Sequence, residues 1–361
     1  MSARIRLAFI LPHLRPGGAE RVVLNYLRAL DRTRFEPFLF LARREGAFLD
    51  LLPEDVTVAD LGNARARALP RRIAHALAAQ RIDIAYSATD AVNLALLASG
   101  WWGARSTRRI VSVHTNPAAW LAEAKHPRLR RWLMRRLYPS AALVAVPTPG
   151  IADELKQLLG RPGLATDVLP NPVVDLIAPA APAPEGTPRI VAAGRLVEAK
   201  GFDILLDAAA LLARRGVSFE LTIHGEGPLH HVLTKQIAAL SLAAHVTLSG
   251  YSAEGLFAGT HLCVVPSRRE GFGNVIVEAM AAGVPVLAAA CPGPVALIEH
   301  GRNGFLVAPE SSEQLADAIA GLLADPARRA SVLTPAYATA QGFEVGAATR
   351  RLEETLTNLA R

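Results

Sequence analysis

The stretch RIVAAGRLVEAKGFDILLDAAALLARR, residues 189–215, decides the fold class. It begins with a short apolar run that ends at Gly194, and from residue 202 its apolar side chains recur at helical spacing. A buried strand, a glycine-containing turn and an amphipathic helix form one βα unit, and repeated βα units build parallel sheets. The segment therefore predicts a parallel α/β sheet.

The same alternation recurs along most of the chain. A proline- and alanine-rich segment, residues 169–188, interrupts it and can neither continue a helix nor pair as a central strand. We therefore expect an α/β protein with two doubly wound, Rossmann-like domains, over residues 1–170 and 171–344. A last helix over 345–361 can pack on either domain, including back on the first. Two such domains facing a cleft would bind a ligand there, because crevices open at the carboxyl ends of parallel strands.

Composition narrows the class of protein. The chain has 361 residues, of which 51% are hydrophobic and 20% charged, which excludes a disordered protein. No run approaches the roughly 20 apolar residues of a membrane-spanning helix. Cys263 and Cys291 lie in or beside apolar runs without metal-ligand spacing, so we expect neither a disulfide nor a metal site, and a reducing compartment. The apolar run near the N-terminus is cut at Pro12, which favours a first strand over a signal peptide.

Charge is unevenly distributed. Residues 1–170 carry 25 Lys and Arg against 14 Asp and Glu, a net charge of +11, whereas residues 171–361 carry 14 against 18, a net charge of −4. The positive potential therefore belongs to the N-terminal half.

The segment PSRREGFGNVIVEAMAAGVPV, residues 266–286, carries two spaced carboxylates. Glu270 lies in a glycine-containing loop, and Glu278 lies in a helix expected to begin near Gly273 or Asn274. Free N–H groups at a helix start suit a phosphate, and eight helical residues span about 12 Å, which suits two sugars flanking a diphosphate. Alternatively, both carboxylates are solvated. Glu278 argues against this, because its neighbours are almost wholly apolar and an unpartnered carboxylate is costly to bury.

This segment resembles the signature of the family 4 glycosyltransferases, enzymes of the two-Rossmann-domain (GT-B) type with a glutamate pair in the context E-G-F-G-x-x-x-x-E-A-M-A. The resemblance covers nearly the whole chain and is strongest from about residue 190 to 307. It implies that Glu278 holds the ribose hydroxyls of a nucleotide. It also implies that Glu270 and neighbouring backbone amides hold the transferred sugar and its phosphate, the amides being those of Gly271, Phe272, Gly273 and Asn274.

Two cations flank the turn in the segment that opens this section. Arg195 follows the strand and Lys200 precedes the helix, positions suited to neutralising a diphosphate, although isolated loop cations are usually only solvated. In the family, the pattern G-R-x-x-x-x-K-G supplies a pyrophosphate clamp, and this sequence has it from Gly194 to Gly201. By resemblance, these cations stabilise the leaving nucleoside diphosphate in place of a metal ion.

Two features of the N-terminal half resemble the family as well. Gly17 and Gly18 open a helix after the first strand, and the resemblance brings the backbone of Gly18 near the donor phosphates; the alternative is a turn chosen for packing. His114 ends the strand RRIVSVH, where a crevice would open, and the family has a histidine there that approaches the transferred sugar. A lone histidine is otherwise more often structural than catalytic.

The turn HGEGPLHHVL lacks the third glycine of a dinucleotide fingerprint and does not follow the first strand, which excludes an NAD site. The family has a G-x-G-P turn here, and the segment after it contributes backbone contacts to the nucleotide base. Gly250 and Tyr251 are the corresponding candidates.

A basic helix is expected within PRLRRWLMRRLYPS, residues 127–140. At helical spacing Arg128, Arg131 and Arg135 form one stripe, and an apolar stripe contains Leu129, Trp132, Leu133 and Leu137. Such a helix can lie on an anionic membrane, attracted by about 1 kcal/mol per nearby cation, or pack on its domain with a solvated arginine face.

A second cluster of basic and aromatic residues, within residues 101–109, favours binding to a membrane surface and therefore a lipid-linked acceptor. Nucleic acid is a weaker alternative, because neither an RNA-binding signature nor zinc-finger spacing is present. The cluster comprises Trp101, Trp102, Arg105, Arg108 and Arg109.

By resemblance we expect a retaining, metal-independent glycosyltransferase without cofactor. It would move a hexose or N-acetylhexosamine from a nucleotide sugar, in this family most commonly a UDP-sugar, to a lipid-linked or other glycan acceptor. The domain over residues 171–344 would bind the donor, and the domain over residues 1–170 would bind the acceptor. The expected location is the cytoplasmic membrane face, as in polysaccharide or lipopolysaccharide biosynthesis. The alternatives are a soluble acceptor and a nucleotide-sugar-binding module without turnover. The expected catalytic residues are His114, Arg195, Lys200 and Glu270.

Overall fold

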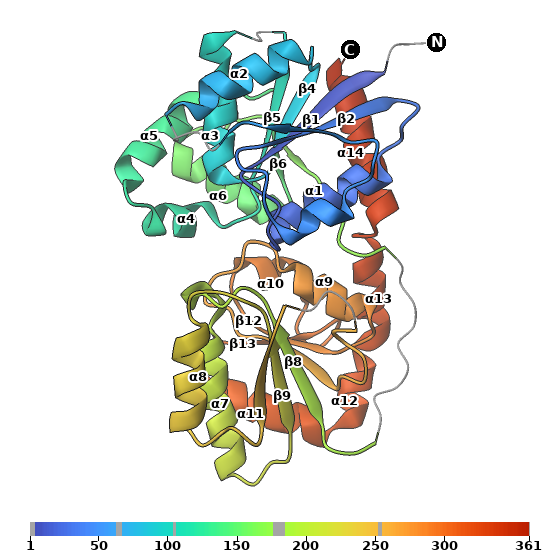
Figure 1. The fold of residues 1–361 in the computed structure, drawn as a ribbon. Coiled ribbons are helices and arrows are strands. Elements are labelled where there is room, and N and C mark those ends of the chain that lie inside the picture. The colour runs from blue at the N-terminus through green and yellow to red at the C-terminus, as the bar shows by residue number, and fades with distance from the viewer. Residues whose placement is uncertain (1–3, 63–66, 104–105, 176–184, 252–254, 361) are drawn as a thin grey trace. The chain divides into compact units, whose positions relative to one another are not determined.

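A computed structural model describes residues 4–62, 67–103, 106–175, 185–251 and 255–360. The chain divides into two compact units (Figure 1). Residues 1–175 and 345–361 form the first unit, and residues 176–344 form the second. Of the expected features, part of the proline-rich segment (176–184) and Arg105 lie outside the described residues.

The first unit contains a seven-stranded parallel sheet in the order β3-β2-β1-β4-β5-β6-β7. β1 alternates its side chains between the two faces: Leu7, Phe9 and Leu11 enter one apolar core and Ala8 and Ile10 the other. Both faces are therefore buried, as in a doubly wound fold. The strands are β1 (Ile5–Leu11), β2 (Phe35–Leu41), β3 (Thr57–Asp60), β4 (Ile84–Ser87), β5 (Arg108–Ser112), β6 (Leu143–Val146) and β7 (Thr166–Val168).

Helices cover both faces of this sheet (Figure 1). The α-helices are α1 (Gly18–Ala29), α2 (Leu69–Ala79), α3 (Asp90–Ala98), α4 (Pro117–Glu123), α5 (Pro127–Leu137), α6 (Pro149–Leu159) and α14 (Val345–Ala360). Three short 3-10 helices accompany them, η1 (Ala47–Leu51), η2 (Ser99–Trp102) and η3 (Tyr138–Ser140).

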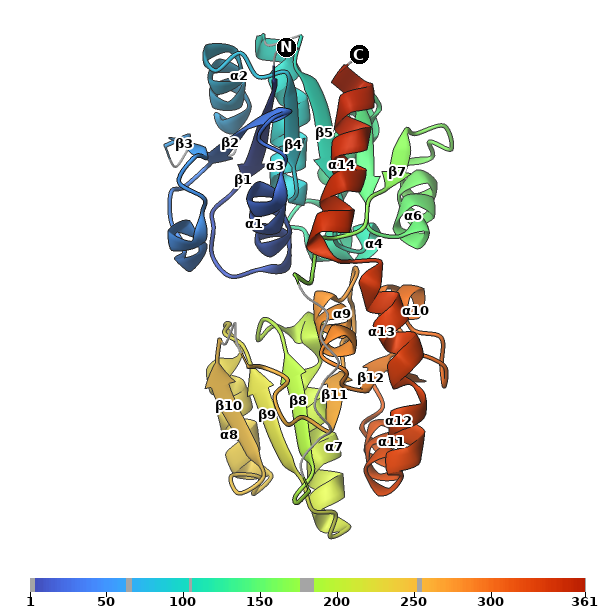
Figure 2. The ribbon, with the colours of Figure 1, turned by 90° about the vertical axis from the view of Figure 1, so that its right-hand side faces the viewer.

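The last helix, α14, belongs to the first unit, and Figure 2 shows it lying across the sheet of that unit. Leu352 and Leu356 are fully buried in the core that also contains β1. Glu353, 4% exposed, accepts a hydrogen bond of 2.7 Å from the backbone N–H of Asp31. A further ion pair of 3.0 Å joins Arg351 to Asp167. Apolar burial and specific polar contacts thus both fix α14 to this unit.

The second unit contains a six-stranded parallel sheet in the order β10-β9-β8-β11-β12-β13. The strands are β8 (Arg189–Ala193), β9 (Glu220–His224), β10 (Val246–Gly250), β11 (Leu262–Val265), β12 (Val286–Ala289) and β13 (Phe305–Val307). The helices are η4 (Glu198–Lys200), α7 (Phe202–Arg214), α8 (His230–Ala239), α9 (Asn274–Ala281), α10 (Pro292–Leu297), α11 (Ser312–Ala324), α12 (Pro326–Ser331) and α13 (Leu333–Gln341).

The predicted fold class is confirmed: each unit is a doubly wound, Rossmann-like α/β unit. The opening segment forms β8, the following turn and α7, and the chain near the N-terminus forms β1. In both sheets the strand order changes direction beside the first strand, between β1 and β4 and between β8 and β11. Ligands bind open α/β sheets at such switch points, outside the carboxyl ends of the strands.

Candidate active site

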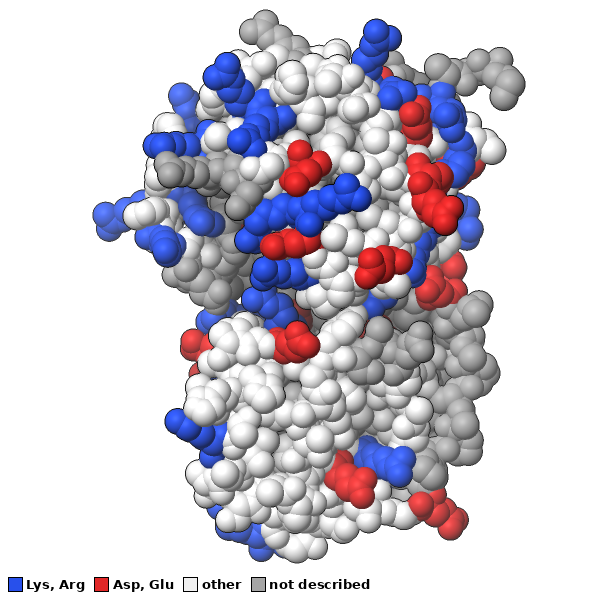
Figure 3. All heavy atoms as spheres, viewed as in Figure 1, with Lys and Arg blue, Asp and Glu red and all other residues white. Residues whose placement is uncertain are grey.

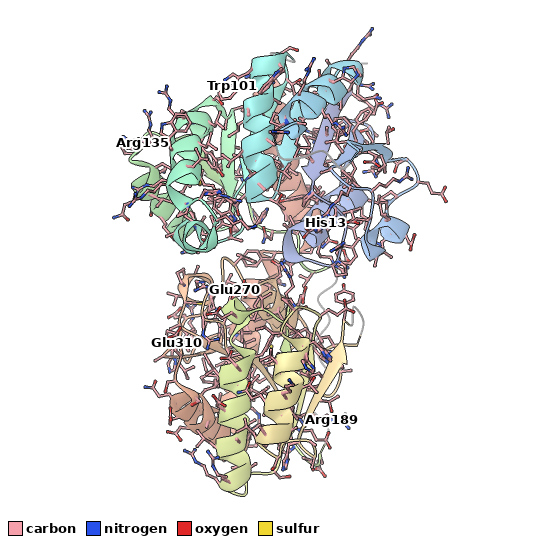
Figure 4. The ribbon with its side chains drawn as sticks, turned by 60° about the vertical axis from the view of Figure 1, so that its left-hand side comes forward. His13, Trp101, Arg135, Arg189, Glu270 and Glu310 are labelled. Atoms are coloured by element: carbon pink, nitrogen blue, oxygen red, sulfur yellow. The ribbon has the colours of Figure 1, made fainter. Side chains whose placement is uncertain are left out.

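The sequence motifs of the second unit lie at its switch point. The loop from Gly194 to Gly201 follows β8, and the loop from Pro266 to Gly273 follows the neighbouring strand β11. Parallel neighbours end at the same edge of a sheet, so the two loops lie side by side although more than 60 residues separate them. Figure 4 shows Glu270 at the end of the unit where these strands finish.

Several contacts hold the two loops together. The ammonium of Lys200 and the carboxylate of Glu270 form an ion pair, with side chains 23% and 12% exposed. The backbone N–H of Arg269 donates to the carbonyl of Ala199 at 3.1 Å. Gly201 has φ +65°, and a Cβ there would stand 2.2 Å from the carbonyl oxygen of Pro266. The position thus requires glycine both for its left-handed backbone and for the close approach of the second loop.

A pair that the sequence motifs did not suggest reinforces this junction. The guanidinium of Arg268 donates two hydrogen bonds, of 2.7 and 2.6 Å, to the two carboxylate oxygens of Asp203 in the first turn of α7. These bonds from Arg268 hold the pKa of Asp203 below its usual range, and they raise the pKa of Arg268. A bidentate ion pair restricts geometry more than a single hydrogen bond does. The Arg268–Asp203 pair therefore holds the two loops together, and with them Lys200 and Glu270.

The residues after Glu270 offer backbone donors. Gly271, Phe272 and Gly273 are buried, and within the described part of the chain their backbone N–H groups donate no hydrogen bond. Helix α9 begins at Asn274, as predicted, after Gly273 with φ +96°. Unpaired N–H groups at a helix start form a site for an anion.

The shape of this loop depends on a glycine in the next βα turn. The N–H of Gly293 in α10 donates to the carbonyl of Glu270 at 3.0 Å. A Cβ at Gly293 would lie 2.8–2.9 Å from backbone atoms of Glu270 and Phe272. The start of α10 therefore packs directly against the backbone of the glutamate loop.

The side chains of the motif have different surroundings. Phe272 is 2% exposed and packs edge-on against Phe343, with ring centroids 5.1 Å apart, so its side chain belongs to the core. Asn274 and Glu278 are half-buried in α9. Burial raises the pKa of the Cys263 thiol in β11, and the charge of Glu278 raises it further. Arg195 is exposed and has no side-chain partner within the described ranges.

The G-E-G-P turn after β9 also packs closely against the first loop. A Cβ at Gly225 would lie 1.9 Å from the carbonyl oxygen of Gly194, and one at Gly227 would lie 2.5 Å from that of Leu196. Its glycines therefore serve close backbone packing, which agrees with the exclusion of an NAD fingerprint. At the end of β10, Gly250 has φ +73° and Tyr251 is 42% exposed.

In the first unit, Gly17 is the N-cap of α1 and Gly18 its first residue. Glu20, 8% exposed, folds back over this start, and a Cβ at Gly17 would stand 2.3 Å from its carboxylate. Glu20 lies in the first turn of α1, as expected for a carboxylate that complements the helix dipole, and its Oε1 is 3.6 Å from Nδ1 of His13.

His114 lies beyond the carboxyl end of β5, as predicted. Its Nε2 is 2.9 Å from the hydroxyl of Ser112, and the side chain of Asn171 lies close to the imidazole. Burial lowers the pKa of His114 to about 4, opposed by the side chain of Asn171. The imidazole is therefore neutral at physiological pH and suited to hydrogen bonding rather than to donating a proton.

The basic helix forms as α5, with Arg128, Arg131 and Arg135 exposed. Of the predicted apolar stripe, Leu137 is buried, whereas Leu129 is 53% and Trp132 is 56% exposed. Met134, outside the stripe, is also buried in the core. Its outward face is thus a mixture of arginines and large apolar side chains.

Two features are absent from the described parts of the chain, a cluster of metal ligands and a membrane-spanning helix. Among these residues no group of three or more His, Cys, Asp and Glu side chains is arranged to hold a metal ion. In the same residues, no helix combines the length and the apolar character that crossing a bilayer requires. Cys263 and Cys291 are both free thiols and both buried.

The paired sheets and the charged loops at the switch point define a class, the two-Rossmann-domain (GT-B) glycosyltransferases. Two family models match adjoining parts of the chain: Glycosyltransferase Family 4 over residues 16–175 and Glycosyl transferases group 1 over residues 174–337. The chain belongs to the family 4 glycosyltransferases, also called glycosyl transferases group 1.

Three known proteins illustrate the similarity. The Anabaena protein Alr3699/HepE, solved in complex with UDP-glucose, superposes with a TM-score of 0.85 and is 26% identical over 98% of this chain and 100% of its own. An alpha-D-kanosaminyltransferase of Streptomyces kanamyceticus is 32% identical over 56% of each chain. A GDP-mannose-dependent alpha-(1-6)-phosphatidylinositol monomannoside mannosyltransferase of Mycobacterium tuberculosis is 36% identical over 38% of this chain and 39% of its own. The chain thus spans only part of the length of the curated relatives it matches, from 24% to 60%.

Proposed function

We propose that the chain transfers a sugar from a nucleotide-sugar donor, held by the second unit at the ends of β8 and β11. One observation carries the proposal: the Lys200–Glu270 ion pair lies at the start of a loop whose buried amides, from Gly271 to Gly273, donate no hydrogen bond to any residue that the structure describes. Exposed Arg195 adds a second cation. Cations and free amides at one switch point suit a diphosphate that is attached to a sugar.

The roles follow from chemistry and family membership. Lys200 and Arg195 neutralise the charge that develops on the leaving diphosphate, replacing a metal ion. Glu270 and the amides bind the transferred sugar and its phosphate, while Glu278 binds the ribose. Further contacts come from the backbone of Gly250 and Tyr251 to the base and, from the first unit, from Gly18 and neutral His114. Transfer proceeds with retention of configuration.

The ion pair gives the site two states. Without donor, Lys200 compensates the half-buried carboxylate of Glu270. A diphosphate competes for the ammonium, and the released carboxylate then accepts hydrogen bonds from sugar hydroxyls. Donor binding would thus itself prepare Glu270 for the transferred sugar.

For the donor, we propose a UDP-linked hexose or N-acetylhexosamine. The Anabaena protein, which aligns over nearly the whole chain, was solved with UDP-glucose. The mycobacterial mannosyltransferase is named as GDP-mannose-dependent and aligns over a smaller part. GDP-mannose is therefore the second donor to test.

For the acceptor, we propose a lipid-linked glycan at the cytoplasmic face of an anionic membrane, as in polysaccharide or lipopolysaccharide biosynthesis. Lys and Arg gather over the first unit, including the side where Figure 1 places α5 (Figure 3). Leu129 and Trp132 stand exposed among the arginines of α5, and Trp101 is 68% exposed on η2. Exposed tryptophans beside cations suit a membrane interface.

The first experiment measures donor binding and turnover. We expect UDP-glucose or GDP-mannose to raise the melting temperature, and UDP or GDP release to depend on Lys200 and Glu270. Lys200→Ala should weaken nucleotide binding at least tenfold, whereas exposed Lys235→Ala should not. Failure of every nucleotide sugar to bind contradicts the proposal. Tight binding with no turnover on any acceptor supports a binding module instead.

The second experiment measures sedimentation with vesicles of phosphatidylcholine, with and without phosphatidylglycerol. We expect binding only to the anionic vesicles, reduced in Trp132→Ser and in Arg128→Gln. Val232→Ser is a matched control, because Val232 is 54% exposed on the second unit. Equal sedimentation with neutral and anionic vesicles, or none, favours a soluble acceptor.

A further inference from the structure

We propose that Asn171 is a positioning residue for sugar transfer: it lies in a rigid segment of the first unit, and its side chain orients the imidazole of His114. The inference rests on the proposed function, because it concerns the histidine that is proposed to face the transferred sugar. The role assigned to Asn171 is indirect, through His114, and no sequence motif suggested it.

Asn171 belongs to residues 169–175, which lead from the first unit into the second and which we call the connector. The N–H of Leu169 donates to the carbonyl of Val146, at the end of β6, at 2.9 Å. From there the connector runs to contacts with α1, which follows β1, and β5 lies between β1 and β6 in the sheet. The connector therefore passes the carboxyl end of β5, where His114 lies.

Two prolines flank Asn171, and α1 holds the carbonyl of each. The hydroxyl of Tyr26 donates to the carbonyl of Pro170 at 3.2 Å, and Nδ2 of Asn25 donates to the carbonyl of Pro172 at 2.8 Å. A proline fixes its own φ and restricts the residue before it to an extended backbone. The direction of the Asn171 side chain is thus set by covalent geometry and by two hydrogen bonds.

The side chain of Asn171 is buried beside the imidazole. Asn171 is 3% exposed, and a buried amide needs hydrogen-bond partners. Burial lowers the pKa of His114, and the hydrogen bond with the side chain of Asn171 opposes this effect. A hydrogen bond that raises the pKa favours the protonated ring, so the amide oxygen of Asn171 accepts from a ring N–H.

Ser112 holds the other nitrogen of the ring. Nε2 of His114 lies 2.9 Å from the hydroxyl of Ser112, so Asn171 serves Nδ1. Ser112 is itself fixed, because Nδ2 of Asn93 donates to its carbonyl at 2.8 Å. When Nδ1 carries the proton for Asn171, Nε2 accepts from the hydroxyl of Ser112. The two partners thus select one tautomer and one orientation of the ring.

A fixed orientation of His114 matters for the reaction. If the ring turned, different atoms would face the transferred sugar. A displacement of about 1 Å at a reacting centre can lower turnover about 10²-fold. A side chain that fixes the tautomer of an active-site histidine is a recurring device in enzymes. The connector supplies such a side chain from a backbone that prolines and α1 make rigid.

The test is long-range ¹H–¹⁵N NMR of the histidine rings in the full chain, which reports the tautomer of each ring. His114→Gln assigns the signal of His114. We expect a single Nδ1–H tautomer in the unmodified protein and a mixture in Asn171→Leu, or in Asn171→Ala if the leucine variant does not fold. Asn171→Asp keeps an acceptor oxygen and should retain the tautomer. Leu77→Ala destabilises the same unit through the core of α2 and should retain it too.

Turnover and nucleotide binding are measured on the same variants. At saturating UDP-glucose or GDP-mannose, Asn171→Leu should release nucleoside diphosphate about tenfold more slowly. Its affinity for the nucleotide should not change, because Lys200 and Glu270 are intact. Asn25→Ala, which frees the carbonyl of Pro172, should have a smaller effect of the same kind.

The outcomes separate this inference from the proposed function. Loss of both the single tautomer and turnover in Asn171→Leu, with nucleotide binding kept, supports the inference. An unchanged tautomer, an altered tautomer with unchanged turnover, or the same alteration in Leu77→Ala overturns it while the donor proposal stands. If no nucleotide binds the unmodified protein, the proposed function fails, and the tautomer still decides whether Asn171 orients His114.

Discussion

The two units share a strand order but present different chemistry at the same edge. At the switch point of the second unit, opposite charges are paired across adjacent loops, Lys200 with Glu270 and Arg268 with Asp203. At that of the first unit, neutral side chains are hydrogen-bonded to one another, Ser87 to Asn93 and Ser112 to His114. Asp90 accepts a hydrogen bond from Thr115 and has no ion-pair partner in the described residues. The difference teaches that the sheet determines where a ligand binds, and that the loops after the strands determine which ligand it is.

The largest expected effect concerns the packing of α14, which only the first unit has. Leu352→Ala with Leu356→Ala should cost that unit several kcal/mol, since each large-to-small core change typically costs about 2–5 kcal/mol. Hydrogen exchange should then show lost protection in β1 to β7 and retained protection in β8 to β13. Exposed Glu354→Ala is the control. Equal loss in both sheets would mean that the units unfold together.

The next effect tests the paired charges of the second unit. Glu270→Gln keeps the shape of the side chain but removes its charge, so Lys200 becomes fully available to a diphosphate. We expect UDP to bind as tightly as before or more tightly, while turnover falls by about 10²-fold. Calorimetry and UDP release measure the two quantities. Glu313→Gln, on the surface of α11, should change neither, and weaker UDP binding in Glu270→Gln would contradict the competition between diphosphate and carboxylate.

A third effect tests the junction of the two loops. Gly201 and Gly216 have similar left-handed backbones, with φ +65° and +70°. A Cβ at Gly201 would lie 2.2 Å from the carbonyl oxygen of Pro266, whereas a Cβ at Gly216 would have no atom within 4 Å. Alanine at either position costs about 1–2 kcal/mol of backbone strain. Gly201→Ala should cost more and should also weaken UDP binding, measured by urea unfolding and calorimetry. Equal costs would show that the loops separate easily.

The smallest effect concerns Asp90. Its pKa is about 6 in the native protein against an ordinary 3.8, so between these values the native state binds more protons than the unfolded state. Asp90 therefore lowers the free energy of unfolding as pH rises through this window. Asp90→Asn should raise the melting temperature by a few degrees at pH 7 and leave it unchanged near pH 4. A lower melting temperature at pH 7 would show that the carboxylate is structurally required.

Local patterns predicted most of the fold. Apolar runs of strand length alternating with helical spacing indicated both sheets, because a parallel sheet buried on two faces needs such runs. The start of α9 at Asn274 was predicted correctly, since glycine before an apolar helical pattern is a local signal. The motifs around Glu270 and Lys200 likewise led to two loops that the structure brings together.

Features that depend on the third dimension were missed. The contact between Arg268 and Asp203 joins residues 65 apart, and no spacing rule connects them. The sequence gives the spacing of Leu129 and Trp132 but not how α5 is rotated on the core, and that rotation exposes both. The raised pKa of Asp90 comes from its surroundings in the folded chain, so its sequence context, a polar residue at a helix start, had no distinctive signal.

The return of α14 to the first unit has a consequence for biosynthesis. The first unit is built from two distant pieces of the chain, with the second unit inserted between them. During synthesis, residues 5–168 leave the ribosome long before Leu352 and Leu356, so the face that α14 covers stays exposed while the whole second unit is made. The nascent first unit should therefore bind chaperones until α14 emerges, whereas all residues of the second unit emerge before α14.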